Sequence, residues 1–103
     1  MKYLVTANRN NVETSSTTEW LTLLQATREY FLTHSKGGAI EGLYVFLDAR
    51  GGIAIFSAES HDQAQDLIIA HPQFPYYDWE IEPILDGLQA YDKFNGLYAK
   101  QVD

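Results

Sequence analysis

The stretch AIEGLYVFLDARGGIAIFSA, residues 39–58, decides the fold. Residues 39–47 and 53–58 are rich in β-branched, aromatic and aliphatic side chains, and residues 48–52 between them contain Arg-Gly-Gly. Two such runs around a short loop that contains glycine predict a β-hairpin.

Both strands of this hairpin carry apolar side chains on both faces. Successive side chains of a strand point to opposite sides, and a sheet with one face in water shows a polar residue at every second position. That alternation is missing here, so we expect both faces of the hairpin to be covered. The two faces carry Leu43, Val45 and Leu47 against Tyr44 and Phe46 in the first strand, and Ile53 and Ile55 against Ala54 and Phe56 in the second.

Regular structure is also expected before the hairpin. Residues 2–8 alternate as a strand, and Thr17 or Thr18 can cap a helix that runs to about Lys36. Gly37 and Gly38 follow, and we expect them to end this helix with positive φ angles. The apolar stripe of the helix recurs at spacings of three and four residues and consists of Trp20, Leu23, Leu24, Thr27, Tyr30 and Phe31.

A second helix and a last strand are expected after the hairpin. Ser60 has the position of an N-cap, and Pro72 is expected to end the helix that it starts. A stiff turn with Phe74 and Pro75 then leads into a strand over residues 77–84, which alternates Tyr77, Trp79 and Ile81 with Asp78, Glu80 and Glu82. The tail predicts a short amphipathic helix, with Leu88, Tyr91, Phe94 and Tyr98 on one face and Gly96 as a weak point.

The element order β-α-β-β-α-β indicates a single α+β domain over residues 1–103 with a ferredoxin-like, four-stranded antiparallel sheet. Two helices cover only one face of such a sheet, whereas the hairpin strands are apolar on both faces and need a cover on each. We therefore expect a homodimer whose sheets pack face to face as a dimeric α/β barrel. Packing of the tail, residues 87–103, on the partner subunit is one arrangement that the sequence leaves open.

Composition restricts the function. Fourteen acidic residues against seven Lys plus Arg give a net charge of −7, which disfavours nucleic acid as a partner. The chain has no cysteine, and its histidines lack the spacing of a zinc site, so we expect no metal. No signal peptide and no apolar run long enough for a membrane span are present, so a cytoplasmic protein without membrane contact is expected.

The segment SHDQAQDLIIAHPQFPYYDWEIEPI, residues 60–84, resembles the C-terminal half of the muconolactone isomerase family. The resemblance covers about residues 39–85, and the residues that carry it are Pro72, Phe74, Pro75, Tyr76 and Asp78. It implies the dimeric α/β barrel, as a homodimer or a larger assembly of dimers. It also implies an enzyme that moves a double bond in a lactone ring by proton transfer, without a metal or organic cofactor. It assigns no catalytic residue, because the Phe-Pro-Tyr segment is a mark of the fold.

Candidate catalytic residues therefore come from the residue pattern alone. Glu41 shares a strand face with Leu43, Val45 and Leu47, so it lies either at a sheet edge in water or buried as a proton acceptor with a raised pKa. His34 is a candidate base at a pocket mouth or a partner of the helix dipole. Two roles stay open for Tyr44: a hydrogen bond to a carbonyl group, or packing in the core. Two positions also stay open for His71: in the lining of a pocket, or packed at the end of a helix.

Candidate binding residues follow the same weighing. Arg50 suits a bidentate contact with the carboxylate of a small organic acid, or is a solvated charge beside Asp48. Trp20, Tyr76 and Trp79 are candidates for the wall of a pocket. The functions left open are a cofactor-free isomerase, a non-catalytic dimeric domain that binds a small ligand or another protein, and a cofactor-free monooxygenase.

Overall fold

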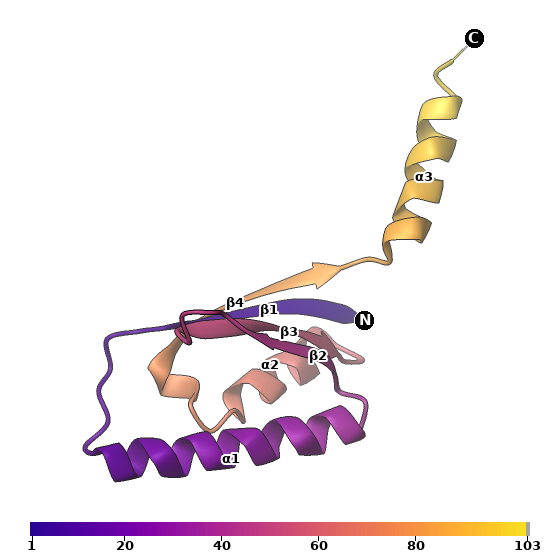
Figure 1. Cartoon of the computed structure of the whole chain (residues 1–103). Helices are drawn as coiled ribbons and strands as arrows, with labels where there is room; N and C mark the ends of the chain where they lie inside the picture. Colours follow the sequence, from indigo (N-terminus) through magenta and orange to yellow (C-terminus); the bar gives the residue numbers. More distant parts are fainter. Residues whose placement is uncertain (103) are drawn as a thin grey trace.

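The computed structural model describes residues 1–102 and has the expected α+β architecture (Figure 1). A four-stranded antiparallel sheet has the strand order β2-β3-β1-β4, and α1 and α2 lie on one of its faces. A short 3₁₀ turn, η1, precedes the last strand. The elements are β1 (Lys2–Arg9), α1 (Thr17–Lys36), β2 (Ile40–Val45), β3 (Gly51–Ser57), α2 (His61–Ile69), η1 (Phe74–Tyr76), β4 (Tyr77–Ile84) and α3 (Gly87–Ala99).

The boundaries of α1 correct two details of the sequence prediction. Ser16, and not Thr17 or Thr18, is the N-cap: its Oγ accepts a hydrogen bond of 3.0 Å from the backbone N–H of Glu19. The Glu19 carboxylate accepts in turn from the backbone N–H of Ser15 at 2.9 Å, which satisfies a second free donor at the helix start.

The C-terminus of α1 needs only one glycine in the left-handed region. Gly38 has φ +83°, whereas Gly37 remains right-handed with φ −78°. One residue of positive φ is enough to turn the chain towards β2.

The second helix starts as predicted and ends earlier. Ser60 caps it by accepting from the backbone N–H of Gln63 at 3.1 Å. The last helical residue is Ile69, so His71 belongs to the turn that follows and not to the helix. Proline restricts the residue before it to extended backbone, so the helix stops before it reaches Pro72.

The hairpin is present, with Gly51 and Gly52 inside β3 and not in the loop. Gly51 has φ +153°, and a Cβ there would lie 1.9 Å from the backbone oxygen of Ala7 in β1. A Cβ on Gly52 would lie 2.3 Å from the backbone oxygen of Tyr44 in β2. The glycines are therefore required because two neighbouring backbones approach them closely.

The core lies between the sheet and the two helices. Tyr3 and Val5 of β1 and Ala54 and Phe56 of β3 are buried on the face that the helices cover. The helices contribute Tyr30 from α1 and Ala64 and Ile68 from α2. Ile40 of β2 and Ala58 after β3 also belong to the cluster. The Tyr30 hydroxyl donates to the backbone oxygen of Leu67, which ties α1 to α2.

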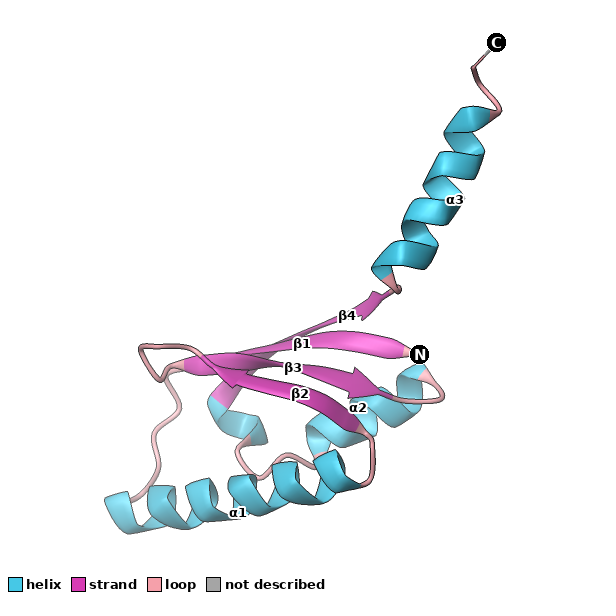
Figure 2. Cartoon of the chain, turned by 45° about the vertical axis from the view of Figure 1, so that its right-hand side comes forward, coloured by secondary structure: helices cyan, strands magenta, loops and turns pink. Residues whose placement is uncertain are grey.

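No helix among residues 1–102 covers the other face of the sheet, which we call the open face (Figure 2). Leu4 pairs with Ile55 and Thr6 with Ile53 on this face, and Tyr44 is 67% exposed there. The three acidic residues of β4 are exposed and alternate onto the same face, as predicted: Asp78, Glu80 and Glu82. Covering of the open face by a second copy stays a prediction.

The predicted C-terminal helix is also present. It projects from the end of β4, away from α1 and α2, and extends the molecule to 67 Å against 27 and 23 Å in the other directions (Figure 1). Within residues 1–102, no helix combines the length and apolar character that crossing a membrane demands.

Candidate functional site

A cavity of about 530 Å³ opens between α1 and the sheet, within the size range of small-molecule sites. Its walls are mainly apolar side chains of α1 and of the central strands. The polar residues that line it are Thr27, Arg28, Ser35, His71, Gln73 and Tyr77. No carboxylate belongs to this lining among residues 1–102.

The turn after α2 carries two buried polar side chains into the cavity wall. His71 and Gln73 flank Pro72, and Gln73 is only 2% exposed. The backbone N–H of Gln73 donates to His71 Nδ1 at 3.0 Å. The hydroxyl of Thr27 on α1 donates to Gln73 Oε1 at 3.0 Å. The first hydrogen bond lies within the turn, and the second joins the turn to α1.

The side-chain amide of Gln73 has a donor without a hydrogen-bond partner in residues 1–102. Its Nε2 is buried and has no hydrogen-bond partner among the described residues. Leaving a buried donor unpaired costs about 1–3 kcal/mol. An oxygen atom of a bound ligand would relieve this cost.

The His71 imidazole is neutral near pH 7. Burial lowers its pKa from 6.5 to about 4. Because Nδ1 accepts the Gln73 N–H, the ring proton is on Nε2. Aromatic rings surround the imidazole, with ring centroids at 4.9 Å for Trp79, 5.1 Å for Tyr30 and 5.4 Å for Phe31. His71 is therefore a neutral hydrogen-bond donor in an apolar surrounding.

Two arginines lie at an adjoining hollow, the mouth, which shares Ala49 and Tyr77 with the cavity. Arg9 is held between aromatic rings, 4.3 Å from the centroid of Trp20 and 5.3 Å from that of Tyr76. Its Nη1 donates to the backbone oxygen of Tyr76 at 2.9 Å. Burial raises the pKa of Tyr77, and the nearby Arg9 charge opposes this shift.

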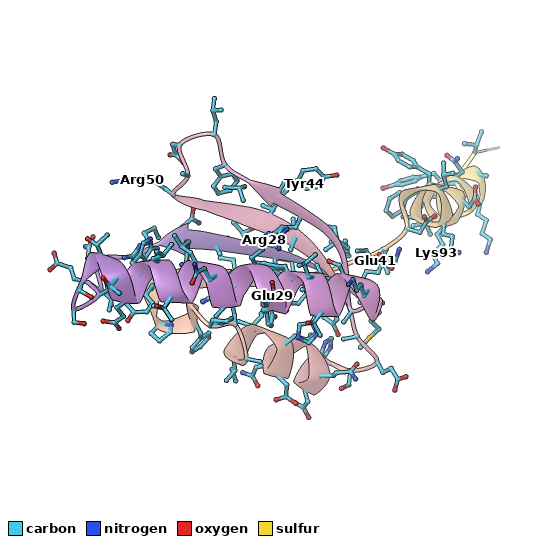
Figure 3. The ribbon with its side chains drawn as sticks, turned by 60° about the horizontal axis from the view of Figure 1, so that its bottom comes forward. Arg28, Glu29, Glu41, Tyr44, Arg50 and Lys93 are labelled. Atoms are coloured by element: carbon cyan, nitrogen blue, oxygen red, sulfur yellow. The ribbon has the colours of Figure 1, made fainter. Side chains whose placement is uncertain are left out.

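Arg50 extends from the hairpin at the edge of the mouth (Figure 3). Its backbone N–H donates to the Asp48 carboxylate at 3.0 Å, but its guanidinium forms no ion pair within residues 1–102. Arg28 lines the cavity itself, so all three arginines of the chain border the cavity or its mouth. Two acidic side chains lie beside them: Glu13 also lines the mouth, and Glu29 pairs with Arg28 at 3.7 Å.

Glu41 lies elsewhere, and the prediction of its strand face is wrong. The pairing of β2 with β3 shifts between Ile40 and Gly42, so a bulge removes Glu41 from the face of Leu43. Its carboxylate forms an ion pair of 3.0 Å with Lys2 at the sheet end. Glu41 is exposed and does not line the cavity (Figure 3).

The other two candidate catalytic residues are also outside the cavity. Tyr44 extends from the open face into solvent (Figure 3). His34 packs on Tyr30 at 4.5 Å between ring centroids and lines a separate hollow beside Gly37. The structure thus does not bring Glu41, His34 and Tyr44 together.

The candidate binding residues lie closer to the cavity. Trp79 lines it, with its indole N–H donating to the backbone oxygen of Phe74 at 3.0 Å. Trp20 and Arg50 line the mouth, while Tyr76 packs on Trp20 at 5.5 Å between centroids. No group of three His, Asp or Glu in the part of the chain that the structure describes is placed to hold a metal ion.

Sequence reasoning missed Gln73 and Thr27 and left His71 open. A search for titratable groups passes over a glutamine and a threonine. The available signal was a glutamine directly after His71-Pro72, in a turn that follows an apolar helix. Such a turn places polar side chains next to the core.

Comparison with known proteins gives one family and one fold. The family model described as muconolactone delta-isomerase matches residues 1–87. A crystal structure of muconolactone isomerase superposes with a TM-score of 0.75 at 17% identity, over 84% of this chain and 90% of that one.

A second solved structure is similar. It is 5-chloro-2-hydroxyhydroquinone dehydrochlorinase from Burkholderia phenoliruptrix AC1100 in complex with 2,5-dihydroxybenzoquinone, with a TM-score of 0.68 at 17% identity, over 86% of this chain and 98% of that one. Likeness at this identity establishes the shared fold. No curated protein matches the chain.

Proposed function

From the premise that this chain belongs to the muconolactone delta-isomerase family, we propose that its cavity binds a small unsaturated cyclic acid and moves a proton and a double bond within it. Such an isomerisation leaves the composition of the substrate unchanged. It requires neither an oxidant nor a reductant.

The unpaired amide donor of Gln73 is the observation that carries this proposal. When a proton leaves a carbon that is conjugated with a carbonyl group, negative charge develops on the carbonyl oxygen. Gln73 Nε2 and His71 Nε2–H are two neutral donors suited to that oxygen. In a site that excludes water, one such donor typically accounts for about 10²–10³ in rate.

His71 is suited to donation because it stays neutral. An imidazole with a pKa of about 4 does not ionise near pH 7, and its Nδ1 is occupied by the Gln73 N–H. It therefore acts as an electrophile towards the carbonyl oxygen and not as the base. The aromatic rings around it provide the flat apolar walls that an unsaturated ring needs.

The proton acceptor is not a carboxylate of the cavity, because none lines it within residues 1–102. Four sources remain: Glu13 at the mouth, water, the carboxylate of the ligand itself, or a side chain of a second copy. An analogue without its carboxylate distinguishes the ligand from the other three sources. If the ligand is the source, the analogue binds without reacting.

The mouth supplies the contact for the acid group of the ligand. Arg50 has a guanidinium free of ion pairs among the described residues, and a guanidinium binds a carboxylate through two parallel hydrogen bonds. A ligand of one ring with a short acidic arm would place its carbonyl at Gln73 and its carboxylate at Arg50.

The second candidate function is a binding domain without catalysis. The lack of a carboxylate in the cavity lining, over the residues that the structure describes, favours it. The related dehydrochlorinase was crystallised with 2,5-dihydroxybenzoquinone, a flat oxygenated ring. A ring of that type, held by Gln73 and released unchanged, would fit the same walls. A cofactor-free monooxygenase is less supported, since only Trp79 of the two tryptophans lines the cavity.

Proton exchange distinguishes these functions. The protein is incubated in D₂O with an unsaturated five-membered lactone that bears a carboxymethyl arm, and ¹H NMR follows deuterium entering the ring. The isomerase proposal predicts exchange above the buffer rate and its loss in Gln73→Leu, while Gln65→Leu on the exposed side of α2 retains it. Ligand binding with exchange at the buffer rate would leave the binding domain as the function.

A further inference from the structure

A second hollow lies between α2 and β4, on the helix-covered side of the sheet. We call it the α2–β4 hollow. Its volume is about 510 Å³, close to the 530 Å³ of the cavity and within the range of small-molecule sites. Its walls are mainly apolar and include Ile69, Phe74, Trp79 and Ile81. Its polar lining comes from Tyr3 and from the first half of α2.

Trp79 separates this hollow from the cavity. It lines both spaces, and among residues 1–102 no other residue belongs to both linings. Its ring centroid lies 4.9 Å from that of His71, which lines the cavity. It lies 6.2 Å from the ring centroid of Phe74, which lines the hollow. The indole is therefore a wall that the two spaces share.

The indole is held in one orientation. Its N–H donates to the backbone oxygen of Phe74 at 3.0 Å, and the Phe74 ring stacks on it with an angle of 20° between the planes. Phe74 begins η1, where Pro75 follows it and fixes the backbone φ. To swing aside, the indole has to break the hydrogen bond and leave the stack.

The helix-facing side chains of β4 give the order of the spaces along the strand. Tyr77 lines the mouth and the cavity, Trp79 lines the cavity and the hollow, and Ile81 lines the hollow. Neighbours on one face of a strand are about 6.8 Å apart. Arg50 lies at the Tyr77 end, because its backbone oxygen accepts from the N–H of Arg9, which pairs with Tyr77. A ligand held by its carboxylate at Arg50 thus approaches Trp79 with its far end.

We propose that Trp79 sets the size limit of the ligand. It accepts one ring with a short acidic arm and excludes an apolar tail on the far side of that ring from the α2–β4 hollow. With a small side chain at this position, the two spaces join and the tail continues along β4 over Ile81. This inference rests on the ligand site proposed above, and it is independent of catalysis because it concerns which molecules bind.

Isothermal titration calorimetry with phenylacetic acid and its para-methyl, para-ethyl and para-butyl derivatives tests this limit. These acids contain one ring, a short acidic arm and a tail opposite the arm. In the wild type, we expect the butyl acid to bind at least about tenfold more weakly than phenylacetic acid, as overpacking of an apolar site does. In Trp79→Ala, each added methylene group should strengthen binding by about fourfold.

Three further variants isolate the wall. Trp79→Val retains a side chain suited to a strand and should also reverse the order of the ethyl acid and phenylacetic acid. Ile69→Trp, added to Trp79→Ala, fills the α2–β4 hollow again and should restore the loss of affinity with a longer tail. Trp20→Ala removes a tryptophan from the mouth and should leave the effect of tail length as in the wild type.

Two outcomes would overturn the proposal on its own. They are a wild type that binds the butyl acid as well as phenylacetic acid, and Trp79 variants that lose affinity with tail length as the wild type does. If none of these acids binds to any variant, both the size limit and the proposed ligand site are wrong. The expected reversal in a protein that exchanges no ring protons would confirm the limit and refute only the isomerase.

Discussion

The hydroxyl of Thr27 on α1 donates a hydrogen bond of 3.0 Å to Oε1 of Gln73 in the turn after α2. This bond joins α1 to the turn and fixes the Gln73 amide by its oxygen, while Nε2 is buried and has no hydrogen-bond partner among residues 1–102. The orientation of the neutral Gln73 amide is therefore the central feature of the site.

Thr27→Val retains the shape of the side chain and removes this hydrogen bond. We expect ligand binding to weaken about fivefold, since one neutral hydrogen bond contributes about 1 kcal/mol. Thr22→Val is the matched control, because Thr22 bonds only to the backbone of α1. Isothermal titration calorimetry with the lactone acid measures both variants. Equal affinities for the two would show that Thr27 does not position Gln73.

The lowered pKa of His71 predicts that the free energy of unfolding depends on pH. Its pKa is about 4 in the folded protein and 6.5 in an unfolded chain, so below pH 6.5 the unfolded state binds more protons. The stabilising effect of the neutral imidazole is therefore complete above pH 6.5 and is lost as the pH falls towards 4. The maximal slope is about 1.4 kcal/mol per pH unit.

Urea unfolding at pH 7.5, 5.5 and 4.5 measures this slope. His71→Gln removes the titrating group and should flatten the dependence between pH 6.5 and 4. His61→Gln, which leaves His71 in place, should retain it. A wild type and a His71→Gln variant with parallel profiles would refute the assignment.

Arg50→Gln should weaken the binding of acidic ligands. We expect a loss of about three- to tenfold in affinity, less than for a buried contact because the guanidinium lies at an exposed mouth. A neutral analogue of the ligand should bind equally to both proteins. Lys36→Gln, the same loss of charge at the far end of α1, is the control. Equal losses of affinity in the two variants would show that the effect comes from net charge and not from a contact of Arg50 with the ligand.

Gly51→Ala should destabilise the sheet. The added Cβ would meet the backbone oxygen of Ala7 at 1.9 Å, and the residue would have to retain a φ of +153°. We expect a loss of roughly 2 kcal/mol or more in the free energy of unfolding. Gly96→Ala in α3 has open space around the new methyl group and should be neutral or stabilising. Urea unfolding of both variants checks this, and a neutral Gly51→Ala would disprove the close approach.

The fold was predictable where its signals are local. The hairpin follows from two apolar runs around Arg50-Gly51-Gly52, and the start of α2 follows from Ser60. The bulge beside Glu41 has no comparable local signal, because it depends on how β2 meets β3. One extra residue in that pairing moved a candidate base away from the cavity.

The site was less predictable because its residues act through distant contacts. The function of Gln73 depends on α2 ending at Ile69 and on Thr27 approaching from another helix. Sequence patterns indicate which side chains ionise, whereas this site uses a neutral amide. Trp79 was identified because alternation in β4 is local.

The most direct test of the central claim is NMR of the Gln73 side-chain amide, assigned with ¹⁵N-glutamine labelling, during titration with the lactone acid. A hydrogen bond to the ligand predicts a downfield shift of one Gln73 Nε2 proton and slower exchange of that proton with water. The exposed Gln65 amide should remain unchanged. Saturating ligand that leaves the Gln73 amide signals in place would contradict the account.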